Sequence, residues 1–493
     1  MSRHSRRHFL KNTAAGSLAA ATFAMGPIAL GRARGANDRL RVAVVGINQR
    51  GQEHIRAYAA MKNVEIAYLV DPDSRLFASR AKWIEDHGRS KPQCLADMRE
   101  ILDDKDLDAV SIATPNHSHA LLAIWACRAG KDVYVEKPCC HNPSEGQMLV
   151  KAARECDRIV QHGTQSRSDA HWQNQVAAVR SGKYGNLLVA YGYASKPRRS
   201  LGFRWPKQPP KELDYNLWLG PAPQQPYHEN LVHYNWHWFW DFGNGEIGNQ
   251  GVHQMDIARW AMPDGAVPKR VLSLGGRYGY QMQDQGQTPN TQLSVIDFGG
   301  PKIIFEDCGL VDAKNTKVTN EFLMEGGTIR DGLFYPRGKK TGEPIEGVAA
   351  KDAGRRVTLS GSVAGGAARD PQQQHFQNFV DCVRSRNREE LAAEIGEGYL
   401  SSRLCLLANI SYRLGKEVPF TQKSRAFGDD DVARAAFDGI AQHLTQAARL
   451  DLKDATYQLG RPLAFDASTE RFLGDDEANG LLTRSYREPF VVE

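Results

Sequence analysis

The stretch Leu40-Arg-Val-Ala-Val-Val-Gly46-Ile-Asn-Gln-Arg-Gly51 decides the fold of this chain. Its β-branched start is typical of a strand that is buried on both faces of a parallel sheet. Two glycines then bracket a turn, and residues 52–61 follow a helical pattern. Strand, glycine loop and helix in this order predict a dinucleotide-binding unit whose loop lies against a pyrophosphate.

The glycine loop departs from the usual G-x-G-x-x-G pattern, because Asn48 stands where the middle glycine is expected. Asn tolerates left-handed backbone angles better than other residues with a side chain, so we expect the turn to survive with looser phosphate packing. The whole loop is a candidate for cofactor binding, and its residues are Gly46, Ile47, Asn48, Gln49, Arg50 and Gly51.

A second strand is expected at 64–70, and it ends at Asp71. Asp71 follows Gly51 at the roughly 20-residue spacing of a carboxylate that binds the adenosine ribose. A carboxylate there would repel a 2′-phosphate, which favours NAD over NADP. Alternatively, Asp71 is a turn residue or a helix N-cap.

The alternation of strands and helices continues for another ninety residues or so. We expect a helix at 74–87, a strand at 107–113, a helix at 117–129, a strand at 132–136, a helix at 144–156 and a strand at 158–162. Such a βαβ series predicts a parallel sheet covered by helices.

The fourth expected strand of the chain, at 132–136, lies in the stretch Asp132-Val-Tyr-Val-Glu136-Lys137-Pro138. Open α/β sheets bind ligands beyond the carboxyl ends of their strands, which is where Lys137 falls. Pro138 fixes its own φ and biases Lys137 toward extended geometry. Lys137 is therefore a candidate catalytic residue, although a solvated Glu-Lys pair at a turn is the alternative interpretation.

Together with Ala113-Thr-Pro-Asn-His-Ser-His119, the Glu136-Lys137-Pro138 segment resembles the Gfo/Idh/MocA family of oxidoreductases, over residues 39 to about 415. The resemblance implies an NAD(P)-dependent oxidoreductase that transfers hydride from a secondary hydroxyl of a sugar or glycoside. It implies that Lys137 holds the reacting hydroxyl. It also implies cofactor contacts by Thr114, Pro115, Asn116, His119, Glu136, Lys137 and Gln165.

A second motif lies in Gly245-Glu-Ile-Gly-Asn249-Gln-Gly-Val-His253-Gln-Met-Asp256. It resembles the D-x-x-x-H motif of the same family, whose His acts as acid or base, but Asn249 replaces the Asp. An amide accepts no proton at neutral pH, so we expect Asn249 to orient a hydroxyl while His253 and Lys137 divide the proton transfer. If the helix starts early, Asn249 and His253 share one edge. The alternative is that His253 is a core histidine.

The aromatic run Tyr234-Asn-Trp-His-Trp-Phe-Trp240 precedes this motif. It is either core packing or a stacking surface for sugar rings, and its candidates for substrate binding are Trp236, His237 and Trp238, beside Asn249 and His253. The spacing of His233, His237 and His253 matches no zinc pattern, so we predict no metal site.

The amino-terminal segment Ser5-Arg6-Arg7-His8-Phe9-Leu10-Lys11 precedes a mildly apolar run and is typical of a twin-arginine signal. It predicts passage through the Tat translocase to the periplasm, and Pro27 with the Ala/Gly content argues against a stable membrane span. Residues 1–36 carry six of the 63 basic residues and no acid, which leaves 57 basic against 57 acidic residues. The net charge of +6 therefore indicates no nucleic-acid binding.

The length predicts two domains behind the signal, in the α/β class. We expect a signal segment at 1–36, an amino-terminal Rossmann domain at 37–165, an α+β domain with a large, mostly antiparallel sheet at 166–420, and a carboxyl extension at 421–493. In the resembled family the second domain binds substrate and forms the contact of a homo-oligomer, a dimer or tetramer. The extension is expected to hold a helix at 430–449 and an irregular end at 463–493.

Because the periplasm offers little free NAD, the expected cofactor is tightly bound and recycled inside the protein. One alternative is a redox-neutral glycosidase or epimerase that oxidises and then reduces the same sugar. Another is a non-catalytic sugar-binding Rossmann protein, which Asn48 and Asn249 favour. An ordinary cytoplasmic dehydrogenase would require Arg6-Arg7 to be a chance match.

Overall fold

The computed structural model describes residues 39–280, 283–347, 370–421, 426–446 and 448–493. The expected signal at 1–36 lies outside these residues. None of the described helices is both long and apolar enough to cross a bilayer.

The first sheet is parallel and has the strand order β3-β2-β1-β4-β5-β6, which is the doubly wound order of a Rossmann domain. Its strands are β1 Leu40–Val45, β2 Val64–Val70, β3 Gln93–Leu95, β4 Ala109–Ile112, β5 Asp132–Val135 and β6 Val160–His162. Helices α1 Gln49–Ala59, α2 Phe77–Asp86, α3 Asn116–Arg128 and α4 Pro143–Glu155 connect them. The sequence pattern had not indicated the short strand β3. The order in which the strands are added reverses between β1 and β4, so that β2 and β3 lie on one side of β1 and β4 to β6 on the other. In sheets of this kind a ligand crevice opens at that point.

The second sheet is mixed, with the order β14-β13-β12-β11-β7-β10-β9-β8-β16-β15. Only β7 and β10 pair in parallel among the described strands of this sheet. The strands are β7 Leu187–Ser195, β8 Arg270–Gly276, β9 Thr291–Asp297, β10 Lys302–Cys308, β11 Lys317–Met324, β12 Gly327–Arg330, β13 Leu333–Pro336, β14 Glu343–Pro344, β15 Lys416–Pro419 and β16 Thr456–Leu459.

Helices cover both faces of this second sheet. On the inner face, Ala190 and Ala194 of β7 pack with Val252 and Met255 of α8. The residues of β7 that alternate with these two alanines point to the outer face, where they pack against α11, a helix of the carboxyl extension. The inner helices are α5 Ala170–Arg180, α8 Gly251–Trp260 and α10 Ile395–Arg413, and α11 spans Asp431–Gln446.

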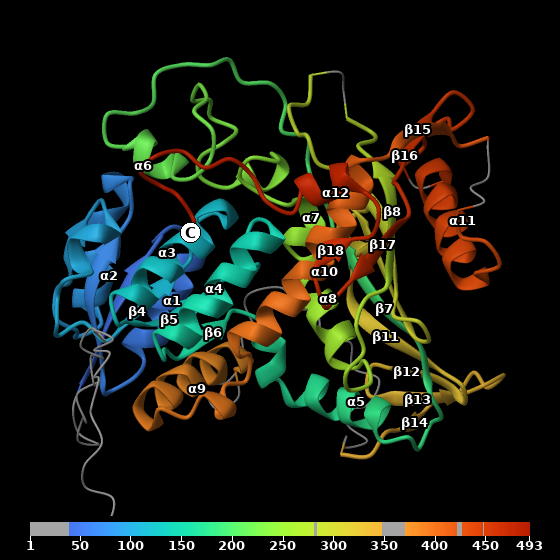
Figure 1. The fold of residues 1–493 in the computed structure, drawn as a ribbon, viewed down its shortest axis with the longest axis horizontal. Helices are drawn as coiled ribbons and strands as arrows, with labels where there is room; N and C mark the ends of the chain where they lie inside the picture. The colour runs from blue at the N-terminus through green and yellow to red at the C-terminus, as the bar shows by residue number, and fades with distance from the viewer. Residues whose placement is uncertain (1–38, 281–282, 348–369, 422–425, 447) are drawn as a thin grey trace, which may run out of the picture. The chain divides into compact units, whose positions relative to one another are not determined.

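Two helices join the sheets. Phe376 and Phe379 of α9 Pro371–Ser385 pack into the core around β1 and α1. Helix α10 lies between the two sheets (Figure 1). It contributes Leu406 to the core of the parallel sheet and Leu407 to the inner core of the mixed sheet. The short helices are α6 Tyr215–Leu219, α7 Gly245–Gly248, α12 Asp476–Gly480 and the 3₁₀ turns η1 Ser74–Leu76, η2 Met98–Ile101, η3 Gln165–Ser168, η4 Asn235–Trp238, η5 Ala313–Asn315 and η6 Arg388–Glu390.

The expectation of an irregular end at 463–493 was wrong. Strand β17 Leu463–Asp466 pairs with β8, strand β18 Arg471–Phe472 pairs with β17, and α12 follows. Leu463, Phe465 and Phe472 are buried in the inner core. Strands this short leave almost no periodic pattern in the sequence. They form because β17 pairs with backbone groups at the edge of β8.

A buried ion pair fixes α8 relative to the end of the parallel sheet. Arg167 of η3 donates through Nε to both oxygens of Asp256, at 3.0 and 2.9 Å, and through Nη2 at 2.8 Å. Ser401 of α10 donates to the same carboxylate at 2.7 Å. Both charged side chains are buried. The pair therefore fixes the helix that carries His253.

We predict that Arg167→Met lowers the free energy of unfolding by about 3–5 kcal/mol, because it leaves Asp256 charged and buried without its partner. Urea unfolding measures the change. The double variant Arg167→Met/Asp256→Leu should recover most of it. A single variant as stable as the parent would contradict this role of the pair.

Candidate active site

A cavity of about 550 Å³ opens beyond the carboxyl ends of β1, β2, β4 and β5. This volume suits a small-molecule or cofactor site. Most of the residues that the sequence singled out line it: Gly46, Asn48, Gln49, Arg50, Asp71, Thr114, Pro115, Asn116, His119, Glu136, Lys137, Trp236, His237 and Asn249. The remaining candidates, Ile47, Gly51, Gln165, Trp238 and His253, are not among the residues that line it.

The glycine loop is shaped by close backbone contacts. Gly46 has a φ of +79°, and a Cβ there would lie 2.8 Å from the backbone of Ala113 and Thr114. A Cβ on Gly51 would lie 1.8 Å from the carbonyl oxygen of Gly46. Asn48 has a φ of −73°, so the expectation that it relies on left-handed geometry was wrong. The positive φ belongs to Gly46, and the turn tolerates a side chain at position 48.

Asp71 lies in the cavity lining and also holds a turn, one of the two roles that the sequence left open. It lines the cavity, and its carboxylate accepts the backbone N–H of Ile47 and that of Asp73, each at 2.9 Å. Burial raises its pKa to about 6, against the effect of these two donors. The group is a turn residue and a cavity acceptor at once.

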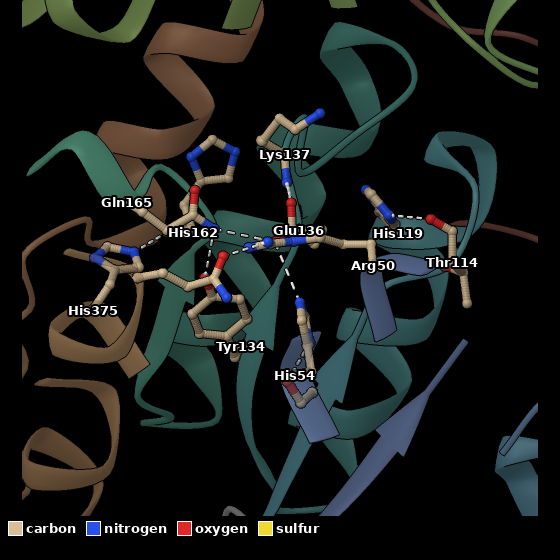
Figure 2. Close-up of polar contacts among 12 residues, drawn as sticks. Arg50, His54, Thr114, His119, Tyr134, Glu136, Lys137, His162, Gln165 and His375 are labelled. Atoms are coloured by element: carbon tan, nitrogen blue, oxygen red, sulfur yellow. Dashed lines mark hydrogen bonds and ion pairs between the residues drawn. The ribbon is translucent and has the colours of Figure 1, made fainter. Parts of the chain in front are cut away.

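Glu136 is the centre of a buried polar cluster under the cavity (Figure 2). Arg50 donates to it through Nε at 2.7 Å, His54 Nε2 lies at 3.3 Å, and Gln165 donates at 3.3 Å. Burial opposes the charge of Glu136, but Arg50 and His54 outweigh it and hold its pKa well below the ordinary value. Gln165 therefore supports Glu136 from behind.

Lys137 directs its side chain away from that cluster, as Figure 2 shows. Its Nζ donates to the carbonyl oxygen of Asn249 at 3.0 Å and to Oδ1 of the same residue at 3.3 Å. Burial lowers the pKa of Lys137 to about 8, with Glu136 opposing the shift and Arg50 and Lys196 adding to it. The side chain lies in the crevice, held by neutral oxygens.

Asn249 and His253 do not share a helix edge, contrary to the expectation. Helix α8 begins at Gly251, and Asn249 caps the end of α7 with a ψ of −90°. A close approach of Gly251 to Phe305 fixes this break. His253 lies behind the cavity, its Nδ1 has no hydrogen-bond partner among the described residues, and burial lowers its pKa to about 3. His253 is therefore neutral.

Thr114 and Asn116 follow β4 at the other wall. His119 Nδ1 lies 2.6 Å from the carbonyl oxygen of Pro138, and its Nε2 lies 2.7 Å from the carbonyl oxygen of Thr114. This histidine therefore links the segment after β4 to the segment after β5. Asn116 donates to Asn244 at 3.1 Å.

The segment 212–244, called the cover segment below, runs over the crevice from one wall to the other. On the β2 side, Asp214 N donates to the carbonyl oxygen of Pro72 at 2.8 Å, and His233 Nε2 lies 2.7 Å from Asp73 Oδ2. On the α3 side, His117 N donates to Phe242 O at 3.2 Å. The cover segment has its own apolar core of Leu213, Trp218, Leu219, Ala222, Tyr227, Leu231, Trp236, Phe239 and Phe242.

The aromatic run lies within the cover segment, where some of its residues line the cavity and others belong to the packing. Trp236 and His237 stack with ring centroids 3.6 Å apart and line the cavity. Trp238 is buried behind them, under the guanidinium of Arg198.

The end of the chain fastens the cover segment. Arg487 donates to Oδ1 of Asn216 at 2.6 Å and to the carbonyl oxygen of Gly220 at 2.8 Å. Phe490 lines the cavity next to Trp125. No local motif could have indicated these residues, because Arg487 lies 271 residues from Asn216 and 267 from Gly220 along the chain.

The site fits a dinucleotide. The glycine loop leaves room for a close approach, and two buried polar atoms of lining residues, Thr114 Oγ1 and Arg50 Nη2, have no hydrogen-bond partner among the described residues. In that part of the chain no three His, Cys, Asp or Glu residues gather as metal ligands would.

Comparison with known proteins agrees with this geometry. Residues 40–164 match the oxidoreductase family with an NAD-binding Rossmann fold, and residues 201–273 match its C-terminal alpha/beta domain. Both parts of the chain are thus similar to the Gfo/Idh/MocA oxidoreductases, and NAD is the cofactor of the matched Rossmann fold.

Two relatives and one solved structure show the range of similarity. A glycosyl hydrolase family 109 protein from Shewanella pealeana is 28% identical over 37% of this chain, and levoglucosan dehydrogenase from Pseudarthrobacter phenanthrenivorans is 24% identical over 53%. The matches span 44% and 63% of those proteins, less than two thirds of each. A levoglucosan dehydrogenase in complex with NADH and levoglucosan has a TM-score of 0.55 at 18% identity, covering 76% of this chain and 95% of that one, which establishes the shared fold.

We predict that the amine of Lys137 loses its proton near pH 8, because burial disfavours the charged form. Only the neutral amine reacts with acetic anhydride, so acetylation of Lys137 should rise through pH 8 and level off above it. Mass spectrometry of the digested protein measures this, with surface lysines, whose ordinary pKa is about 10.4, as internal controls. A Lys137 midpoint equal to theirs would contradict the assignment.

Proposed function

We propose that this protein is an NAD-dependent oxidoreductase that acts on a secondary hydroxyl of a sugar or glycoside. The observation that carries the proposal is the position of Lys137, a buried amine with a pKa of about 8 beside the NAD-binding loop. Asp71 at the ribose end supports NAD over NADP. A non-catalytic binding protein would have no need for an amine tuned to this range.

Bound NAD supplies the hydride acceptor, and the residues of the chain handle the proton. The neutral amine of Lys137 accepts the proton of the sugar hydroxyl as the carbon loses its hydride. Asn249 fixes the amine through two oxygens, so that its lone pair faces the cavity. His253, neutral and with Nδ1 unpartnered among the described residues, is available to accept a hydrogen bond but not to donate a proton as an acid. Trp236 and His237 offer a flat face to the sugar.

We further propose that the cofactor stays bound and is recycled in place. The cover segment is hydrogen-bonded to both walls of the crevice and is fastened by Arg487, which supports slow exchange. The second candidate, a redox-neutral glycosidase or epimerase, uses the same retained cofactor, and the similarity to a family 109 glycosyl hydrolase favours it. We also propose that the protein is exported to the periplasm through the Tat translocase and that it assembles into a dimer or tetramer.

We expect Lys137→Ala to lower turnover by about 10²–10⁴-fold, the usual contribution of a general base, while NAD stays bound. Turnover is read from the nicotinamide absorbance of the holoprotein mixed with glucose, inositol or levoglucosan, and with a nitrophenyl glycoside for the second candidate. Lys151→Ala, on the exposed face of α4, is the matched control. Unchanged turnover in Lys137→Ala would refute the catalytic role.

Protein purified from the periplasmic fraction should release NAD(H) on denaturation, as mass spectrometry would detect. Arg487→Met should release it about tenfold faster from the native protein, since a charged hydrogen bond contributes roughly 1.5–3 kcal/mol to the closed cover. Arg337→Met, on a distant hairpin, is the control. If the protein is confined to the cytoplasm, the export proposal is overturned. If the periplasmic protein contains no NAD(H), the retention proposal is overturned.

A further inference from the structure

Two ammonium groups meet at the turn between α7 and α8. Lys137 Nζ holds Asn249, and Lys196 Nζ donates to Oε1 of the next residue, Gln250, at 2.7 Å. The two lysines come from different sheets, since Lys137 follows β5 and Lys196 follows β7. Lys196 lies close enough to Lys137 to lower its pKa.

The position of Lys196 follows from the pleat of β7. Ala190 and Ala194 face the inner core, so Lys196, two residues further, points from the same face toward α8. Arg198 is next on that face and forms a bidentate pair with Glu246 of α7, at 2.7 and 2.6 Å. Lys196 and Arg198 thus reach the α7–α8 turn side by side.

The acids around this turn are already engaged. Glu246 is paired with Arg198, and Glu136 with Arg50. Asp307 is fully buried, and burial raises its pKa well above the ordinary value, which makes it neutral. His237 and His253 are neutral too, because burial lowers their pKa values.

Lys196 therefore carries a positive charge without a paired counterion, next to a Lys137 that is neutral when it acts as the base. No carboxylate among the described residues lies within ion-pair distance of either lysine Nζ, whereas the buried cations Arg167 and Arg403 each have one. Lys196 is half-buried, and a partly desolvated charge without a counterion is stabilised when a ligand neutralises it. The missing negative charge points to the substrate.

We propose that Lys196, which bonds to Gln250 next to the cavity-lining Asn249, forms a subsite at the edge of the cavity for an anionic substituent of the sugar, a carboxylate or a sulfate ester. This rests on the proposed function and narrows its substrate class to acidic sugars. Lys196 acts as a specificity-determining residue, while the hydroxyl chemistry stays at Lys137.

The test compares matched acidic and neutral sugars on the holoprotein at fixed ionic strength. Calorimetric titration uses D-glucuronate and D-galacturonate beside D-glucose and D-galactose, with glucose 6-sulfate and sodium sulfate as sulfate probes. At least one anionic sugar should bind about tenfold more tightly than its neutral counterpart, as expected for charged hydrogen bonds. The carboxylate and sulfate arms distinguish the two kinds of anion.

Lys196→Met keeps the apolar stem and should abolish that preference, whereas Lys196→Arg should retain most of it. Lys183→Met, on the surface, is the control. The inference is overturned if no anion binds the parent, if neutral sugars bind as tightly, or if Lys196→Met keeps the preference. The cofactor absorbance separates the two proposals: if neutral sugars reduce NAD and no acidic sugar binds more tightly than its neutral counterpart, only the subsite is refuted. Acidic sugars that bind through Lys196 without changing the cofactor support the subsite and sink only the oxidoreductase proposal.

Discussion

The contact between Lys137 Nζ and Asn249 is the constraint on which the site depends. One partner is placed by the end of β5 and the other by the turn between α7 and α8, so the contact exists only when the two sheets are docked. Helix α10 and the Arg167–Asp256 pair hold that docking. The reactive amine is thus positioned by the packing of the whole described molecule rather than by a local motif.

Electrostatics in the low-dielectric crevice then decide the chemistry. Burial penalises every charge, and a carboxylate with a guanidinium partner keeps its charge in spite of it, as Glu136 does beside Arg50. Lys137 has only neutral oxygens as partners, and its pKa is lowered to about 8. The same reasoning argues against His253 as the acid that the motif suggests, because an imidazole that burial keeps neutral has no proton to donate as an acid.

Enclosure of the crevice comes from parts of the chain that are not themselves part of the Rossmann unit. The cover segment has an apolar core of its own and bonds to both walls, and the carboxyl-terminal residues fasten it. Such a cover supports the proposed retention of the cofactor, because a covered crevice slows the exchange of a dinucleotide bound beneath it.

By itself, the sequence determined the Rossmann unit and its ligand-binding edge. Strands such as β2 and the loop from Gly46 to Gly51 follow from local patterns, because buried parallel strands and tight turns each demand particular residue types. Lys137 was predicted from its place at the end of a strand, whereas Thr114 and Glu136 were expected only from the resemblance to a family. Only the tertiary structure decided the break before α8, the strands β17 and β18, the cover segment and the meeting of Lys196 with Lys137. Those features arise from contacts between distant segments, and the free energy of such contacts leaves no periodic trace along the chain.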